Sequence, residues 1–461
     1  MRFLTRLIPA LLICLSPAAF AQDPGTIQTI VGGGQTEGEG IPATDIALNG
    51  PSDAVLDAAG NIYIADRENH RIRKVDITTG TISTIAGTGQ AGFSGDAGPA
   101  TDAQLNTPQA ITLDQSGNLY IADSRNRRIR RMDATTGTIS TIAGTGERGV
   151  ESVEGPAISV AFDDIVALLA DGNEFLYISE NAEDLRTSSY RVRRMDLVAG
   201  TVQAFAGTGS PSFSGDSGPA TEAGVAPIGL ALDASRNVYI SDFNNFRIRR
   251  VDITSGLITT VVGRGSINPI IGLGGFGGDG GPATDAFLNL PFAVTVDQSG
   301  TLYIADTGNQ VLRSVDPETQ TIVTIAGIPS EIEGFSGDGG LALDAQLGRP
   351  GKILIDSDGN LLFVDIGNNR IRKLFDPTFR ITILNQITNR IDFFRTTVGE
   401  PTTRSARIAN FGNAPLTVQR VTSNQPDFSV LTPFPFQIGP FQEAEIQIRF
   451  APPLEGPFEG L

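Results

Sequence analysis

The chain has one cysteine, Cys14, and one histidine, His70, among its 461 residues. Because Cys14 lies near the N-terminus, inside a segment that we expect to be removed, the remaining chain has no thiol, disulfide or thiolate metal ligand. A zinc site is excluded, since such sites gather several His, Cys or acidic ligands. His70 does not partner a serine nucleophile, so hydrolysis by a serine–histidine pair is excluded as well.

Long apolar stretches are also scarce. Residues 1–21 contain Arg2 and Arg6, an apolar run and an A-x-A motif before Gln22, which is the pattern of a secretory signal peptide. No other stretch is long enough to cross a bilayer. We therefore expect a bacterial protein without a transmembrane segment that is secreted, to the periplasm, the cell surface or the extracellular medium.

Basic residues are in the minority. The sequence has 51 acidic and 34 basic residues and a formal net charge of −17, which becomes −19 when Arg2 and Arg6 leave with the signal peptide. A surface this acidic repels phosphate backbones, so we expect no nucleic-acid partner. It is compatible with cations, and Ca²⁺ is the one cofactor that we consider.

What the sequence has in abundance is a repeat. The motif "NIYIAD", which ends at Asp66, returns in similar form with its last residue at Asp123, Glu180, Asp242, Asp306 and Asp365. The intervals between these positions are 57, 57, 62, 64 and 59 residues. Self-similarity at such an interval indicates a solenoid, a propeller or an array.

Each repeat contains four short runs of alternating strand-forming residues, separated by turn residues, and no amphipathic helical run of ten residues. Six units of four antiparallel strands predict an all-β fold, a six-bladed β-propeller over residues 22–377. Residues 26–32 match the fourth strand of a repeat. We therefore expect this N-terminal strand to pair with residues 370–375 and close the ring, with residues 380–385 as the alternative closing strand.

The connector between repeats contains a glycine pattern that is also found in dinucleotide-binding loops. Residues 87–92 read G-x-G-x-x-G, but this pattern has that meaning only between a strand and a helix. It returns at residues 144–149, so we interpret it as a compact connector whose glycines take positive φ angles. We expect "PATDAQL" to form one helical turn before Pro108 begins the next inner strand.

The motifs "GTGQAGFSGDAGPATDAQL", "NLYIAD" and "NNRIRKL" resemble those of the NHL-repeat family, in its bacterial exported form. The resemblance spans residues 26–376 and implies a propeller fold. NHL propellers include RNA-binding regulators, receptor sensor domains, adhesion proteins and a few lyases. The resemblance therefore leaves the function open.

The composition changes at about residue 378. Polar and apolar residues alternate there, with turn signals every eight to twelve residues, which predicts an Ig-like β-sandwich over residues 378–461. The segments "IANFGNAPLTV", "PDFSV" and "IRFAPP" resemble the choice-of-anchor D and Hydin-type Ig-like modules. Such modules normally continue with one more strand, so we expect this one to be truncated.

The second strand of most repeats ends in an aspartate that is followed five residues later by an arginine. These residues are either a ring of catalytic carboxylates or structural pairs that hold the second strand to the third. Recurrence in nearly every repeat favours the structural interpretation. The pairs are Asp66–Arg71, Asp123–Arg128, Asp242–Arg247 and Asp365–Arg370.

A second set of aspartates recurs in the connector, where glycines flank it. Carboxylates in this setting bind Ca²⁺ together with backbone carbonyls, or accept backbone N–H groups of their own turn. The sequence leaves both interpretations open. The candidates are Asp96, Asp216, Asp279 and Asp338.

The third repeat departs furthest from the pattern. It lacks the "FSGD" motif, and the turn between its second and third strands is about six residues longer than in the other repeats. Strand parity places both features on one face, where their acids form a candidate patch for a cationic group or Ca²⁺; drift in a surface loop is the alternative. The candidate patch comprises Asp163, Asp164, Glu180, Glu183 and Asp184.

These features together predict a monomeric, non-enzymatic recognition or scaffold protein whose propeller face binds a protein or a glycan. The alternative is a divalent-cation-dependent enzyme of the lactonase or lyase type, with carboxylates at the central tunnel. Three or four carboxylates converging at one mouth of the tunnel would favour the enzyme. A tunnel lined by apolar side chains or glycine would favour the binding protein.

Overall fold

The structure is a computed structural model of the chain. It describes residues 12–13, 25–149, 154–181, 189–268, 272–330, 332–375, 381–383, 402–410, 416–418, 421–422, 428–433, 436–439 and 442–450. Thr26–Leu374 form one compact unit, and Met1–Gly25 with Phe375–Leu461 form a second. Apart from Leu12–Ile13, the predicted signal peptide lies outside the described residues.

Within the described residues, no helix has both the length and the apolar character needed to cross a membrane.

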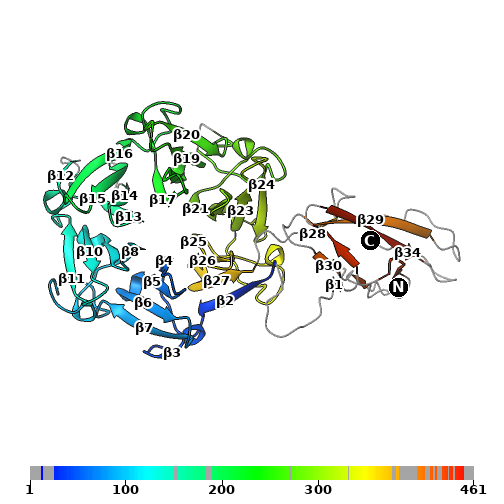
Figure 1. Cartoon of the computed structure of the whole chain (residues 1–461), viewed down its shortest axis with the longest axis horizontal. Helices are drawn as coiled ribbons and strands as arrows, with labels where there is room; N and C mark the ends of the chain where they lie inside the picture. Colours follow the sequence, from blue (N-terminus) through cyan, green and yellow to red (C-terminus); the bar gives the residue numbers. More distant parts are fainter. Residues whose placement is uncertain are drawn as a thin grey trace, which may run out of the picture. The chain divides into compact units, whose positions relative to one another are not determined.

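The first unit consists of six antiparallel blades around one axis, as predicted (Figure 1). The inner strands are β4 (Pro51–Leu56), β8 (Pro108–Leu113), β13 (Asp164–Asp171), β17 (Pro227–Leu232), β21 (Pro291–Val296) and β25 (Pro350–Ile355). The second strands are β5 (Ile62–Asp66), β9 (Leu119–Asp123), β14 (Phe175–Asn181), β18 (Val238–Asp242), β22 (Leu302–Asp306) and β26 (Leu361–Asp365).

The remaining two strands complete each blade. The third strands are β6 (Arg71–Asp76), β10 (Arg128–Met132), β15 (Tyr190–Asp196), β19 (Arg247–Val251), β23 (Val311–Val315) and β27 (Arg370–Leu374). The outer strands are β7 (Thr81–Ala86), β11 (Ile139–Ala143), β16 (Thr201–Gly209), β20 (Ile258–Val262), β24 (Ile322–Ala326) and, in blade six, β2 (Ile27–Gly32).

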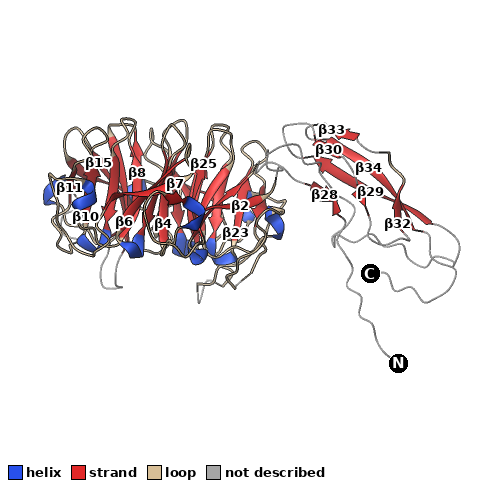
Figure 2. Cartoon of the chain, turned by 90° about the horizontal axis from the view of Figure 1, so that it is seen from below, coloured by secondary structure: helices blue, strands red, loops and turns tan. Residues whose placement is uncertain are grey.

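Single turns of 3-10 helix join the strands, and most of them gather toward one face of the propeller (Figure 2). Those between second and third strands are η2 (Arg67–Asn69), η4 (Ser124–Asn126), η7 (Phe243–Asn245), η9 (Thr307–Asn309) and η11 (Ile366–Asn368). Those in the connectors are η1 (Ala43–Asp45), η3 (Ala100–Asp102), η5 (Ala157–Ser159), η6 (Ala220–Glu222), η8 (Ala283–Asp285) and η10 (Ala342–Asp344). The helical turn predicted before Pro108 is therefore present as η3.

The N-terminal strand closes the ring, as predicted. β2 pairs antiparallel with β27, from Ile27 opposite Leu374 to Gly32 opposite Arg370. The alternative closing strand, β28 (Ile381–Ile383), instead pairs with β29 (Thr402–Asn410) in the second unit. Because β2 comes from the other end of the propeller sequence, its pairing joins the two ends of the repeat array.

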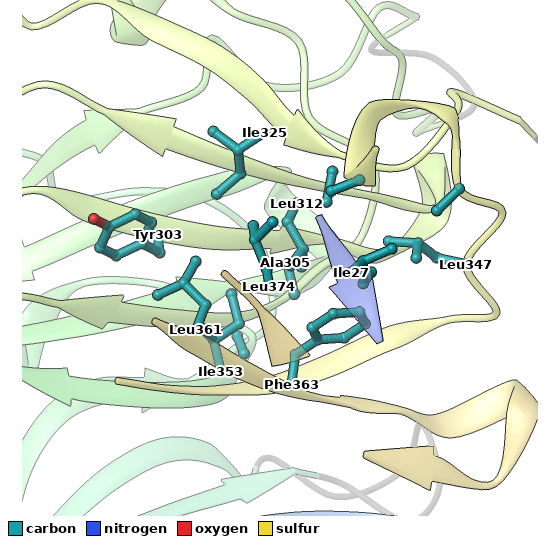
Figure 3. Close-up of a cluster of buried hydrophobic side chains, with 14 residues drawn as sticks. Ile27, Tyr303, Ala305, Leu312, Ile325, Leu347, Ile353, Leu361, Phe363 and Leu374 are labelled. Atoms are coloured by element: carbon teal, nitrogen blue, oxygen red, sulfur yellow. The ribbon is translucent and has the colours of Figure 1, made fainter. Parts of the chain in front are cut away.

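Six hydrophobic clusters form the core, one between each pair of neighbouring blades. The cluster between blades five and six includes Ile27 of β2, which lies near Leu347 and Phe363 (Figure 3). The alternating β-branched and aliphatic residues of each strand supply the two buried faces of a blade. Closing the ring therefore also completes a core cluster.

The connectors protect the outer edges of the blades. Proline-containing segments pair briefly with the outer strand of the blade that they enter, as β3 (Ile41–Pro42) on β7 and β12 (Gly155–Pro156) on β16. Pro99, Pro219 and Pro282 make single bridges in the same place. A proline has no N–H to offer a further strand, so these edges are poor templates for aggregation.

Positive φ angles explain the glycine pattern of the connectors. Gly87 has a φ of 91° and Gly89 one of 86°. A Cβ on Gly87 would lie 2.4 Å from the main-chain oxygen of His70, so no other residue fits there without rearrangement. The motif is thus part of a blade connector, as predicted.

The second unit is described only in part. β28, β29, β34 (Gln442–Phe450) and β32 (Phe428–Val430) form a four-stranded sheet in that order. Two further pairs are β30 (Leu416–Val418) with β33 (Phe436–Ile438), and β1 (Leu12–Ile13) with β31 (Val421–Thr422). The described part is all β, and the Ig-like sandwich over residues 378–461 stays a prediction.

Candidate functional site

Each blade buries one arginine of its third strand, with at most 2% of the residue exposed. These residues are Arg73, Arg130, Arg193, Arg249, Arg313 and Arg372. In blade two, Arg130 Nη1 lies 3.3 Å from Asp123 Oδ2 at the end of the second strand. The corresponding distances are 3.7 Å in Asp242–Arg249, 3.4 Å in Asp306–Arg313 and 3.5 Å in Asp365–Arg372.

The predicted arginine partner was therefore wrong, although the structural interpretation of the aspartates is supported. Asp123 and Arg128 are opposite each other in the ladder, yet Arg128 donates to the main-chain oxygens of Asn126 and Thr145. Arg130 lies two residues further along the same face of the strand and reaches the carboxylate from the buried side. The predicted partners Arg247 and Arg370 are replaced in the same way. Asp242 pairs with Arg249, and Asp365 pairs with Arg372. In blade one, Asp66 accepts hydrogen bonds from Asn49 N and Asn69 Nδ2, and Arg71 donates to the main-chain oxygen of Thr88.

The connector aspartates bind the other side of the same guanidinium groups. Arg130 Nη2 lies 2.8 Å from Asp96 Oδ1, and Asp96 also accepts a hydrogen bond from Thr141 of the outer strand. The equivalent ion pairs are Asp216–Arg249, Asp279–Arg313 and Asp338–Arg372. Each carboxylate thus fastens the connector to its blade, so Ca²⁺ would have to displace a guanidinium.

Nothing in the geometry supports a metal site at these aspartates. The described residues include no group of three or more His, Cys, Asp or Glu side chains that could hold a metal ion. Ca²⁺ binding at Asp96, Asp216, Asp279 or Asp338 stays a prediction from the sequence. In blade one the connector carboxylate is that of Glu39, whose Oε1 lies 3.6 Å from Arg73 Nη1. Glu39 was not predicted from the sequence, because residues 33–45 lack the "FSGD" motif.

A phenylalanine of the connector covers the arginines from outside. The Arg128 guanidinium carbon lies 4.0 Å from the centre of the Phe93 ring, and that of Arg130 lies 4.9 Å away. Phe213, Phe276 and Phe335 stack on arginines of their own blades in the same way. Cation–π contacts of this kind stabilise by about 0.5–2 kcal/mol each, which gives the recurrent "FSGD" motif a structural role.

Burial changes the acidity of the paired carboxylates. Loss of solvation raises the pKa to about 6, against the opposing effect of asparagine, backbone N–H and arginine donors. The groups concerned are Asp123, Asp242, Asp306 and Asp365. The pKa is raised because burial penalises the charged carboxylate more than its asparagine, backbone and arginine partners stabilise it.

Blade three buries two of the acids that were predicted to form a recognition patch, Glu180 and Asp163. Glu180 is fully buried and pairs with Arg193, so it replaces the aspartate of the other blades. Asp163 is 1% exposed; it lies 2.9 Å from Arg148 Nε and accepts a hydrogen bond from Ser189. Loss of solvation raises the pKa of Glu180 to about 7. Neither buried side chain is available to a partner.

The remaining members of the predicted patch are only partly described, and the patch that they were predicted to form stays a prediction. Asp164 is half-buried in β13 opposite Asn181. Glu183 and Asp184 lie outside the described residues. The acidic character of the third repeat therefore reflects at least two buried structural groups, a role that side-chain type alone does not reveal.

A small pocket, which we call the central channel, lies among the inner strands. Its wall includes Val166, Ala167, Ile228, Gly229, Leu230, Phe292, Ala293 and Val294 from blades three to five. Blades one and six contribute Ser52, Asp53 and Lys352. The free space inside is about 20 Å³, which is room for about one water molecule.

One charged pair interrupts this small and apolar lining. Lys352 Nζ lies 3.9 Å from Asp53 Oδ1, which is beyond hydrogen-bonding distance. Asp53 accepts hydrogen bonds from the main-chain N–H groups of Ala54 and Ile111, both at 2.9 Å. The pKa of Asp53 is raised, because the effect of burial is larger than the opposing effects of Lys352 and the two backbone donors.

This charged pair was not predicted from the sequence. The positions equivalent to Asp53 and Lys352 in the other blades hold Ala110, Ala167, Gly229 and Ala293. An alignment of the six inner strands would have shown two charges where four repeats have glycine or alanine. The recurrent "NIYIAD" motif lies in the second strands, so it gives no information on these inner-strand positions.

The chain is similar to NHL-repeat proteins over much of its length. Residues 48–75 match the model of the NHL repeat. The chain is 28% identical over 343 residues to human NHL repeat-containing protein 2, covering 70% of this chain and 46% of that protein. It is 27% identical over 337 residues to Protein SUPPRESSOR OF QUENCHING 1, chloroplastic, of Arabidopsis thaliana, covering 70% of this chain and 30% of that protein.

Solved structures show the same fold. An auxiliary nutrient binding protein from Bacteroides thetaiotaomicron superposes with a TM-score of 0.53 at 16% identity, covering 75% of each chain. A similar protein from Bacteroides ovatus gives 0.51 at 14% identity, again covering 75% of each chain. The chain spans less than half the length of the curated relatives named above. Together the repeat match and the structures support an NHL-type six-bladed β-propeller.

Proposed function

We propose that this protein is an exported, non-enzymatic recognition protein whose propeller face binds a protein or a glycan. The lining of the central channel carries the proposal. Its wall is alanine, glycine and aliphatic or aromatic side chains apart from Ser52, Asp53 and Lys352. This is the kind of lining that favours a binding protein over a tunnel enzyme.

The enzyme of lactonase or lyase type has less support. A divalent cation in the channel would require several carboxylates, since such ions take six or more oxygen ligands. Asp53 is the one carboxylate among the described residues that line the channel, and a single carboxylate supplies too few oxygen ligands for such an ion. The residues present do not fit such a metal, so we derive no reaction through one.

The second unit would then act as a spacer or attachment module, with an Ig-like fold. Export follows from the signal peptide predicted over residues 1–21. The net charge of −17 favours neutral or basic partners over acidic ones. Glycans belong in the first screen because a protein of the same fold is named as a nutrient-binding protein.

A glycan and peptide array probed with the full exported chain, with and without Ca²⁺, tests this proposal. We expect selective binding to at least one class of ligand, with the same ranking in both conditions. A parallel assay with a panel of lactones measures turnover. Turnover that requires Ca²⁺, or no selective binding to any glycan or peptide, would contradict the proposed function.

A further inference from the structure

The charged pair in the channel is not needed to build the propeller. Four of the six equivalent positions hold alanine or glycine, and those blades have the same strand order. Burying an ion pair generally gives no more stability than burying apolar side chains of the same volume. The presence of Asp53 and Lys352 at this position therefore calls for an explanation other than folding.

Lys352 has hydrogen-bonding capacity to spare. Its side chain is 21% exposed, and its Nζ makes no hydrogen bond to any residue that the structure describes. The nearest carboxylate oxygen, on Asp53, is 3.9 Å away. Asp53 itself is held in place by two backbone N–H groups, and each of its oxygens keeps a free lone pair. The channel thus presents a donor and an acceptor side by side.

Apolar side chains line the channel together with this pair. Val166, Ile228 and Phe292 line the same cavity and are half-buried. The Phe292 ring is fixed by an edge-to-face contact with Phe243 of η7, with ring centres 6.4 Å apart. Phe243 belongs to η7, a turn between second and third strands, so this part of the channel lies near that turn.

Charge and size select among the groups that the channel admits. An anionic group beside Lys352 would be repelled by Asp53, and a cationic group beside Asp53 would be repelled by Lys352. A hydroxyl group is neutral; it accepts a hydrogen bond from the ammonium and donates one to the carboxylate. With free space of about 20 Å³, the channel has room for one such group but not for a sugar ring.

We propose that the mouth of the central channel binds a neutral sugar of a glycan, with one hydroxyl between Lys352 and Asp53 and a C–H face of the ring on Phe292. This deepens the proposed function, on which it rests, by assigning the ligand class and the site. The hydroxyl takes the place of the water molecule for which the channel has room. Its two hydrogen bonds to charged groups are of the strong kind.

Isothermal titration of the full exported chain with maltose, cellobiose and lactose tests the site. Glucuronic acid, glucosamine and N-acetyl-glutamine amide serve as the anionic, cationic and peptide-like comparisons. We expect at least one neutral disaccharide to bind and the three comparison compounds to bind at least about tenfold more weakly. Preferential binding of a charged sugar or of the amide would overturn the inference.

Two variants locate the binding. Lys352→Met should weaken the disaccharide by about tenfold, the loss of one charged hydrogen bond, and Phe292→Ala should weaken it through the lost ring contact. Lys373→Met is the matched control, because Lys373 lies in the same blade but pairs with Asp356 at 2.7 Å outside the channel. Melting curves establish that each variant is folded.

Binding that survives Lys352→Met and Phe292→Ala unchanged would overturn the site. If the chain selects only peptides on the array, this inference fails while the proposed recognition function stands. If the array shows no selective ligand and no disaccharide binds, both fail. The two experiments thus separate the ligand class from the general function.

Discussion

A buried arginine between two carboxylates is the repeated unit that holds the blades of this propeller. Arg130 contacts Asp123 at the end of the second strand and Asp96 in the connector. The acids that look catalytic in the sequence therefore join strand to strand and connector to blade. Because the guanidinium is fully buried, removing one partner leaves an uncompensated charge in the interior.

Substitution of the two neighbouring arginines distinguishes the buried ion pair of Arg130 from the half-buried contact of Arg128 with Phe93. Arg130→Met should lower the free energy of unfolding by about 3–5 kcal/mol, because it leaves Asp123 and Asp96 without their cation. Arg128→Met removes a cation–π contact with Phe93 and two hydrogen bonds to main-chain oxygens, and should lower it by about 1–2 kcal/mol, because the side chain is partly solvated. Urea denaturation measures both. Equal losses, or a larger loss for Arg128→Met, would restore the pairing predicted from the sequence.

Glu180 makes stability depend on pH. Its pKa of about 7 in the folded chain lies above the ordinary value of 4.5. Between these values the folded state holds a proton that the unfolded state has lost, so stability falls as pH rises from 4.5 through 7. Glu180→Gln should reduce this fall by at most about 3 kcal/mol.

Melting temperatures from pH 5 to 8 test this dependence. Glu174→Gln, which changes an exposed carboxylate, is the control and should follow the wild type. A wild-type melting temperature that rises across this range, or a Glu180→Gln profile identical to wild type, would contradict the assignment.

At the scale of strands and blades, much of the fold could be predicted from the sequence. The alternation of apolar and polar residues within short runs predicted the strands. The match of residues 26–32 to the fourth strand of a repeat predicted β2, because strand pairing depends on the backbone and on this alternation. The ion pairs could not be assigned in the same way. Arg128 and Arg130 both recur and both point to one face of β10, and only their depth decides which one meets Asp123.

The closing strand offers a test at this scale. Ile27→Ala in β2 should lower the free energy of unfolding by about 2–5 kcal/mol, because Ile27 is fully buried in the cluster between blades five and six. Ile77→Ala is the control, since Ile77 is 55% exposed and should change stability by less than about 0.5 kcal/mol. Both are measured by urea denaturation.

Deletion of residues 25–32 extends this test to the whole ring. It would leave β27 as an unpaired edge, so we expect loss of cooperative unfolding or association of the chains. A deletion variant that stays monomeric and unfolds like the wild type would show that β2 does not close the ring.

At the scale of the whole molecule, the six blades share one strand order. We therefore look for the functional residues at positions where the blades differ in side chain. The inner strands supply that difference, since Asp53 and Lys352 stand where the other blades have alanine or glycine. This could not be predicted from the repeat motifs, because a ring position gains its meaning only when six strands meet around one axis.

The affinity of the ligand ranked first on the array, measured for the wild type and for Asp123→Asn, tests the central claim most directly. The claim is that the repeated carboxylates hold the blades together and do not contact the ligand. We predict that Asp123→Asn melts at a lower temperature, yet binds within about twofold of the wild type when both are folded. An Asp123→Asn protein with unchanged melting and lost binding would contradict the account.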